Sequence, residues 1–179
     1  MKESVAEKIK NKFADNLRRC WIEGKGHGIK ATDTLHHGEF VCEYAGEFLD
    51  PKETEERERK YNRKPRGKPR VGSWMLWFMT EGHTEYCSID ATEDDGRMGR
   101  FINHPKEANL RVRVHKTEQH PRVYFTAKEC IYRNQELLYP YGIRNKKSLG
   151  ENAFLNDKER KLPVKLCEEC KYKKKKIYK

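Results

Sequence analysis

Apolar and polar residues alternate in short blocks along most of the chain. Val5, Ile9 and Phe13 recur at a spacing of four with charged residues between them, which predicts a helix over residues 3–17. After this segment, short apolar or alternating runs are separated by turn residues such as glycine and asparagine, and each run predicts a strand. The predicted strands cover residues 18–22, a run that begins at 29, then 40–44, 47–49, 74–79, 85–90, 111–114, 122–126 and 136–139. Short strands with a turn about every eight to twelve residues are typical of a mostly β domain.

Two segments interrupt the strand pattern. Residues 51–60 are almost wholly charged and predict a helix, and residues 61–71 predict a loop rich in proline, glycine and arginine. Towards the end of the chain the apolar pattern gives way to polar, lysine-rich sequence. The 179 residues therefore divide into an N-terminal helix (1–19), one β domain (20–145) and a basic C-terminal extension (146–179).

Composition narrows the class of protein. Apolar residues make up 35% of the chain and charged residues 37%, but an aromatic content of 11% argues against a fully disordered chain. No apolar run is long enough to cross a membrane, and the first residues lack the apolar segment of a signal peptide. We therefore expect neither a secreted nor a membrane protein, and we expect its cysteines to be reduced.

The net charge of +11 is concentrated near the C-terminus. Residues 158–179 hold ten Lys and Arg residues and three Glu residues, a net charge of +7, and a second basic run covers residues 60–70. Such runs are usually solvated arms, and they also bind the phosphate backbone of nucleic acids. The two interpretations are compatible, because a disordered arm can become ordered on DNA.

Five short motifs follow one another through the β domain. The five motifs lie at residues 24–28 (GKGHG), 38–44 (GEFVCEY), 89–91 (IDA), 99–105 (GRFINHP) and 136–142 (ELLYPYG). In this order they resemble the SET-domain lysine methyltransferases over residues 20–145. The stretch CSIDAT at 87–92 and the last motif are most similar to the branch that monomethylates lysine twenty of histone H4.

The resemblance implies a fold and a cofactor site. The fold is a mostly β SET-domain fold of several small sheets with short helices, an N-terminal helix and a pseudoknot near the C-terminal end of the core, which brings residues near 103 and near 140 together. The implied cofactor is S-adenosyl-L-methionine, with S-adenosyl-L-homocysteine as the product. The residues implied to bind it are Lys25, Gly26, His27, Trp74, Asn103 and His104.

The resemblance also implies a lysine-binding channel with three tyrosines. Tyr141 matches the tyrosine at the reaction centre, Tyr139 matches the position that limits the number of methyl groups, and Tyr44 is a candidate for the channel wall. A lysine amine has a reference pKa near 10.4, so presenting it neutral at pH ~7.4 costs roughly 4 kcal/mol. An apolar channel next to a sulfonium favours the neutral amine. This chemistry needs no metal, and none is expected.

Three substitutions depart from the family pattern. Pro105 stands where the family usually has serine, Pro140 stands where the branch has aspartate, and Trp74 replaces an expected tyrosine. Each proline removes a backbone donor near the predicted site. The alternative to an active enzyme is therefore a catalytically silent SET-fold module that binds chromatin.

Four of the six cysteines form two pairs with different expected environments. Cys42 and Cys87 lie in apolar runs and are expected to be buried as free thiols. Cys167 and Cys170 form a Cys-x-x-Cys pair, which is half of a zinc site. Because no second pair follows in the sequence, the pattern favours an exposed thiol pair over a metal site.

Together these features predict a nuclear, monomeric methyltransferase that acts on chromatin. The predicted substrate is lysine twenty of histone H4 on a nucleosome, and another histone or nonhistone lysine is the alternative. DNA contacts are expected through the basic arm at residues 168–179 and the loop at 60–70.

Overall fold

The computed structural model describes residues 4–10, 14–63, 74–79, 85–104, 107–141 and 165–171. The helices and strands within these ranges are short. They are α1 (Val5–Lys10), β1 (Leu17–Ile22), β2 (Gly26–Ala31), β3 (Phe40–Tyr44), β4 (Glu47–Leu49), α2 (Pro51–Asn62), β5 (Met75–Phe78), β6 (Cys87–Asp90), the 3₁₀ turn η1 (Gly99–Phe101), β7 (Leu110–His115) and β8 (Arg122–Ala127). Neither described α-helix is long and apolar enough to span a membrane.

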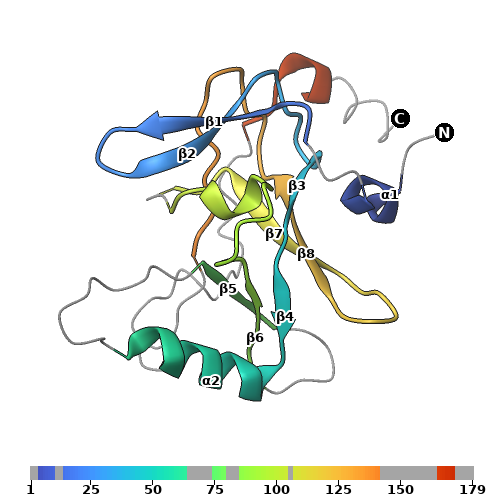
Figure 1. Ribbon diagram of the computed structural model, residues 1–179. Helices are drawn as coiled ribbons and strands as arrows, with labels where there is room; N and C mark the ends of the chain where they lie inside the picture. Colours follow the sequence, from blue (N-terminus) through green and yellow to red (C-terminus); the bar gives the residue numbers. More distant parts are fainter. Residues whose placement is uncertain are drawn as a thin grey trace.

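Three small antiparallel sheets make up the fold of the described residues. Strands β1 and β2 form a hairpin, the second sheet has the order β3-β8-β7, and the third has the order β4-β6-β5. The hairpin lies at one end of the molecule and the third sheet, with α2 beside it, lies at the other, with the β3-β8-β7 sheet between them (Figure 1). The predicted mostly β fold of several small sheets is confirmed.

One core joins the three sheets. Its fully buried side chains come from all three sheets and from the chain after η1 and after β8, and they include Ile29, Cys87, Ile102, Phe125 and Leu137. Cys42 and Cys87 are buried free thiols, as predicted. The alternating burial of β8, in which Val123, Phe125 and Ala127 face inward, is the strand pattern that the sequence indicates.

Two predicted elements differ from the structure. The helix predicted over residues 3–17 is described only for Val5–Lys10, and Leu17 is the first residue of β1, where it pairs with Ala31 and is buried. The predicted strand at 136–139 is not a strand. Its residues make single bridges to two different segments, Glu136 with Lys30 and Leu138 with Asn103, so no continuous ladder forms.

The C-terminal end of the core lies between two other segments. The N–H of Tyr139 donates to the carbonyl of Asn103 (3.1 Å), and on the other side the N–H groups of Asn109 and Leu110 donate to the carbonyl of Leu138 (3.2 and 3.1 Å). The Asn109 side chain also accepts from the N–H of Leu138 and donates to the carbonyl of Glu136, each at 2.8 Å. The predicted approach of residues near 140 to residues near 103 is therefore confirmed.

Helix α2, predicted at 51–60, begins with a capping box. The Asp50 carboxylate accepts from the N–H of Glu53 (2.8 Å), and the Glu53 carboxylate accepts from the N–H of Asp50 (3.0 Å). Pro51 in the first turn costs no helical hydrogen bond, because its position has no intrahelical acceptor. Local sequence thus sets where this highly charged helix starts.

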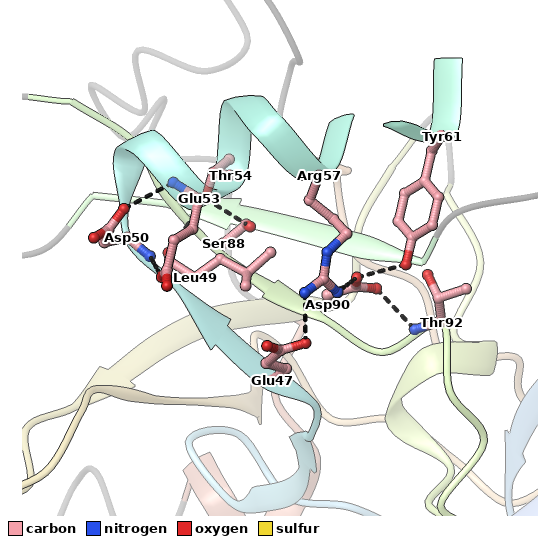
Figure 2. A network of polar contacts seen from close by, with 10 residues as sticks. All are labelled: Glu47, Leu49, Asp50, Glu53, Thr54, Arg57, Tyr61, Ser88, Asp90 and Thr92. Atoms are coloured by element: carbon pink, nitrogen blue, oxygen red, sulfur yellow. Dashed lines mark hydrogen bonds and ion pairs between the residues drawn. The ribbon is translucent and has the colours of Figure 1, made fainter. Parts of the chain in front are cut away.

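Polar contacts hold α2 on the third sheet (Figure 2). Arg57 donates to Asp90 (2.6 Å) and Glu47 (2.8 Å), and the Tyr61 hydroxyl donates to Asp90 (2.7 Å). Burial by itself raises the pKa of the Asp90 carboxyl, but hydrogen bonds from Thr92, Tyr61 and Arg57 outweigh burial and hold this pKa below its ordinary value. Only Thr54 of α2 is buried, with its hydroxyl 2.9 Å from the Ser88 hydroxyl of β6, so this contact and the Asp90 carboxylate attach the helix to the sheet.

Replacing Asp90 should therefore loosen α2. Asp90→Asn is expected to lower the free energy of unfolding by about 2 kcal/mol at pH 7, because Arg57 and Tyr61 lose their charged acceptor. Since the folded pKa is depressed, this stabilisation is present above the unfolded pKa near 4 and is lost as pH falls towards the lower folded pKa. Urea unfolding of both proteins at pH 7 and in acid measures the difference.

The matched control is Glu55→Gln, which removes an exposed ion pair with Arg59 on the same helix. It should change the free energy of unfolding little at either pH. Equal stability of the Asp90→Asn variant and the wild type at pH 7 would contradict the assigned role of Asp90.

Candidate active site

The nine predicted site residues come from five separate parts of the chain. Residues 25–27 form the turn and first positions of β2, Tyr44 ends β3, Trp74 precedes β5, residues 103–104 follow η1, and residues 139 and 141 lie in the C-terminal segment of the core. Hydrogen bonds and ring contacts connect four of these parts, whereas Trp74 contacts Arg100.

Glu136 links the glycine-rich turn to Asn103. Its carboxylate accepts from Lys25 Nζ (2.9 Å) and from Asn103 Nδ2 (3.0 Å), and the same amide also donates to the carbonyl of His27 (3.2 Å). A Cβ on Gly28 would lie 2.8 Å from the Asn103 amide nitrogen, so the absence of a side chain there permits this approach. Glu136 was not among the predicted site residues, although it begins the last of the five motifs.

The three tyrosines form one aromatic cluster. Ring centroids are 6.2 Å apart for Tyr44 and Tyr139 and 4.9 Å apart for Tyr139 and Tyr141. Tyr44 and Tyr139 are buried, whereas Tyr141 is 42% exposed. The cluster therefore leads from the surface at Tyr141 to a buried pair of hydroxyl-bearing rings.

Tyr141 is fixed by the segment that follows η1. Its N–H donates to His104 Nδ1 (3.0 Å), its hydroxyl donates to the carbonyl of Ile102 (3.0 Å), and its ring lies 5.3 Å from the His104 ring. Both backbone and side chain of Tyr141 are thus oriented by residues 102–104.

The Tyr44 hydroxyl stays protonated. Burial raises its pKa, the nearby Tyr141 raises it further, and a hydrogen bond with Tyr139 only partly opposes the shift. At neutral pH this group is a neutral hydroxyl that can donate or accept a hydrogen bond. The residue before Tyr44, Glu43, has a buried carboxylate that pairs with Arg97 (2.6 Å) and Arg122. These ion pairs help to fix the position of Tyr44.

Arg100 is a second residue that the sequence predictions missed. Its guanidinium carbon lies 4.3 Å from the Trp74 ring centroid, and the residue is 8% exposed. Nε and Nη1 are buried and have no hydrogen-bond partner among the described residues; Nη1 lies 3.7 Å from a carboxylate oxygen of Asp94. Buried donors normally have acceptors, so these two nitrogens are suited to an acceptor-bearing ligand.

The substitutions at 74 and 140 fit the observed backbone. Pro140 is exposed, and the hydrogen bonds on either side of it are made by the N–H groups of Tyr139 and Tyr141, so the proline removes neither. Trp74 stacks on Arg100, and its backbone bonds to Thr92 and Ala91. Pro105 lies outside the described residues.

Comparisons with known proteins give a consistent family. A family model described as the SET domain matches residues 26–142. The N-lysine methyltransferase KMT5A-A of Danio rerio is 34% identical over 86% of this chain and 43% of that protein, and the histone-lysine N-methyltransferase Set8 of Drosophila melanogaster is 37% identical over 79% of this chain and 20% of that protein. The chain thus spans less than half the length of these curated relatives.

Solved structures agree with the sequence relatives. The crystal structure of CpSET8 from Cryptosporidium has a TM-score of 0.64 and 30% identity over 78% of this chain and 63% of that chain. The methyltransferase domain of human SETMAR has a TM-score of 0.56 and 26% identity over 70% of this chain and 44% of that chain. With the domain match over most of its length and the five ordered motifs in place, the chain belongs to the SET-domain family.

Proposed function

We propose that this protein is a histone-lysine N-methyltransferase that uses S-adenosyl-L-methionine and monomethylates lysine twenty of histone H4. The observation that carries the proposal is the cluster of Tyr44, Tyr139 and Tyr141 against the Asn103–His104 segment. The relatives named as lysine methyltransferases support the reaction class.

The residues present fit the proposed cofactor. S-adenosyl-L-methionine carries a carboxylate and ribose hydroxyls, which can accept hydrogen bonds. They could serve as acceptors for Nε and Nη1 of Arg100, which have no hydrogen-bond partner among the described residues. The rings of Trp74 and Phe101, whose centroids lie 4.3 and 5.3 Å from the Arg100 guanidinium carbon, provide aromatic surface. The Lys25–His27 turn, Asn103 and His104 would complete the binding residues, and when bound the cofactor would supply the sulfonium methyl group.

The tyrosine cluster accounts for the protein's part in the reaction. A lysine amine entering past the half-exposed Tyr141 leaves water as it approaches the buried Tyr44 and Tyr139, which favours the neutral amine. Uncharged hydroxyls can then orient the nitrogen lone pair without holding a proton on it. The buried Tyr139 ring and hydroxyl occupy space beside the amine, and we propose that they limit the product to one methyl group.

The proposed partners are the histone H4 tail in a nucleosome and its DNA. The basic arm at 168–179 and the loop at 60–70 would contact the phosphate backbone, although most of both segments lies outside the described residues. Such partners would place the protein in the nucleus, acting as a monomer.

Mass spectrometry of nucleosomes incubated with the protein and S-adenosyl-L-methionine tests this function. The wild type should add one methyl group to lysine twenty of histone H4. Tyr141→Phe should reduce the rate about 100-fold, because it removes the hydroxyl that bonds to Ile102 and orients the site. Tyr132→Phe, an exposed tyrosine outside the cluster, is the control and should be active.

Each other outcome is informative. Methylation at the same background level by the wild type and Tyr141→Phe would contradict the enzyme proposal. It would favour the alternative, a chromatin-binding module without activity. Trimethylated product would overturn the role of Tyr139, and methylation elsewhere would overturn the choice of substrate.

Arg100→Gln should weaken cofactor binding. Loss of the buried charge removes hydrogen bonds to a charged group, so calorimetry should give a dissociation constant for S-adenosyl-L-methionine about 10- to 100-fold higher. Arg113→Gln, an exposed arginine on β7, should bind like the wild type. An unchanged affinity in a folded Arg100→Gln protein would exclude Arg100 from the cofactor site.

Removing residues 172–179 should separate peptide from nucleosome activity. This deletion takes away five lysines and leaves the described segment at 165–171 intact. Methylation of an H4 peptide should be unchanged, whereas methylation of nucleosomes should fall and depend less steeply on salt. Equal loss on both substrates would contradict a DNA-binding role for these residues.

A further inference from the structure

Four metal-ligating side chains meet at the C-terminal segment, away from the nine predicted site residues. The nitrogen or sulfur ligand atoms of His36, Cys130, Cys167 and Cys170 all lie within 4.8 Å of one another. His36 Nδ1 is 3.3 Å from Cys167 Sγ and 3.6 Å from Cys170 Sγ, and the sulfurs of Cys130 and Cys170 are 3.5 Å apart. None of these side chains takes part in the candidate active site.

The core holds the first two of these residues together. Leu35 and Ile131 form an antiparallel bridge with two backbone hydrogen bonds of 2.8 and 2.9 Å, and both side chains are buried. This bridge sets the next residue, His36, beside the preceding residue, Cys130. Half of the cluster is therefore built on rigid backbone that does not depend on the C-terminal segment.

The other two residues come from one helical turn, drawn in red in Figure 1. The N–H of Lys171 donates to the carbonyl of Cys167 (3.0 Å), and this turn presents Cys167 and Cys170 to the same point. The segment is joined to the core by a hydrogen bond from the N–H of Cys130 to the carbonyl of Lys165 (2.9 Å).

We propose that His36, Cys130, Cys167 and Cys170 form a structural zinc site. Tetrahedral zinc with Zn–S near 2.3 Å and Zn–N near 2.0 Å places its ligand atoms about 3.5 to 3.8 Å apart. Three of the six separations, at 3.3 to 3.6 Å, lie within a few tenths of an ångström of these values, and none of the six exceeds 4.8 Å. Three cysteines and one histidine leave no open coordination position, which is typical of structural and not catalytic zinc.

Contacts around the cluster support the same assignment. The second nitrogen of His36, Nε2, lies 3.4 Å from a carboxylate oxygen of Glu169, the arrangement that orients metal-binding histidines in known sites. The N–H of Cys167 donates to the sulfur of Cys130 (3.0 Å), a contact that stabilises a thiolate. A disulfide between Cys130 and Cys170 would use only two of the four groups and would require their sulfurs to move to about 2.05 Å.

The sequence expectation for this cysteine pair is thereby replaced. Cys167 and Cys170 are half-buried, not exposed. The missing ligands precede the pair, with Cys130 separated from Cys167 by 37 positions and His36 by 131, so a search for a second pair after it could not find them.

The zinc would fix the chain beyond the active site. Tyr141 is the last described residue of the core segment, and the next described residues, Lys165–Lys171, include two of the ligands. Metal binding would therefore hold both ends of the intervening chain against one domain. This inference concerns fold stability and does not rest on the proposed methyltransferase activity.

Metal analysis of the full chain, purified with a reductant, tests the site. The wild type should bind about one zinc ion per chain, and cobalt should give the thiolate charge-transfer and visible bands of tetrahedral coordination. Cys170→Ser should lose both signals or weaken zinc binding at least ~10-fold, since three ligands remain. Cys20→Ser, a half-buried cysteine outside the cluster, should bind zinc like the wild type.

Two further measurements guard against a variant that fails to fold. Modification of the wild-type thiols should release zinc to a colorimetric chelator, and Cys170→His, which keeps a ligand, should retain zinc. A chelator should also lower the melting temperature of the wild type, because a bound ligand stabilises the folded state. Less than ~0.1 zinc per chain after reconstitution, or equal zinc binding by the wild type and a folded Cys167→Ser/Cys170→Ser protein, would overturn the proposal.

Discussion

The structure depends on the placement of residues 136–141 between two other segments of the chain. This short stretch uses its backbone on both sides, bonding to Asn103 on one and to Asn109 and Leu110 on the other. Glu136 at its start holds Lys25 and Asn103, and Tyr141 at its end packs on His104. Because the bonds are single bridges and not a ladder, different residues of the stretch bond to different neighbours, which come from three distant segments at 25–30, 103–104 and 109–110.

Close backbone packing between η1 and β3 positions the buried Tyr44. A Cβ on Gly99 would lie 2.3 Å from the carbonyl oxygen of Glu43, so only glycine lets η1 lie against β3 at this point. That contact brings Arg100 to the neighbourhood of Tyr44, whose pKa it affects. The buried Glu43 carboxylate pairs with the partly exposed Arg97 and Arg122 and so positions the same strand.

Sequence alone could predict the parts of this protein that follow local rules. Alternation in β8, the capping box of α2 and the motif residues Asn103 and Tyr141 all carry their signal within a few residues. The missed features are set by tertiary contact. The partners of Glu136 come from two other segments of the chain. The two Arg100 nitrogens lack hydrogen-bond partners because the side chain is buried by tertiary packing. Leu17 continues the four-residue spacing of the predicted N-terminal helix, but it is a buried strand residue that pairs with Ala31.

The structure divides the basic C-terminal sequence into two parts of different charge. From the sequence, residues 158–179 look like one basic arm with a net charge of +7. In the structure, Lys165–Lys171 packs on the core, and within it Glu168 and Glu169 are engaged by Lys171 and His36. These acids offset the local bases, so the strongly positive part begins after Lys171. The DNA contacts proposed for the arm would therefore begin directly after a neutral segment that is fixed to the domain, so that they could orient the domain and not merely tether it.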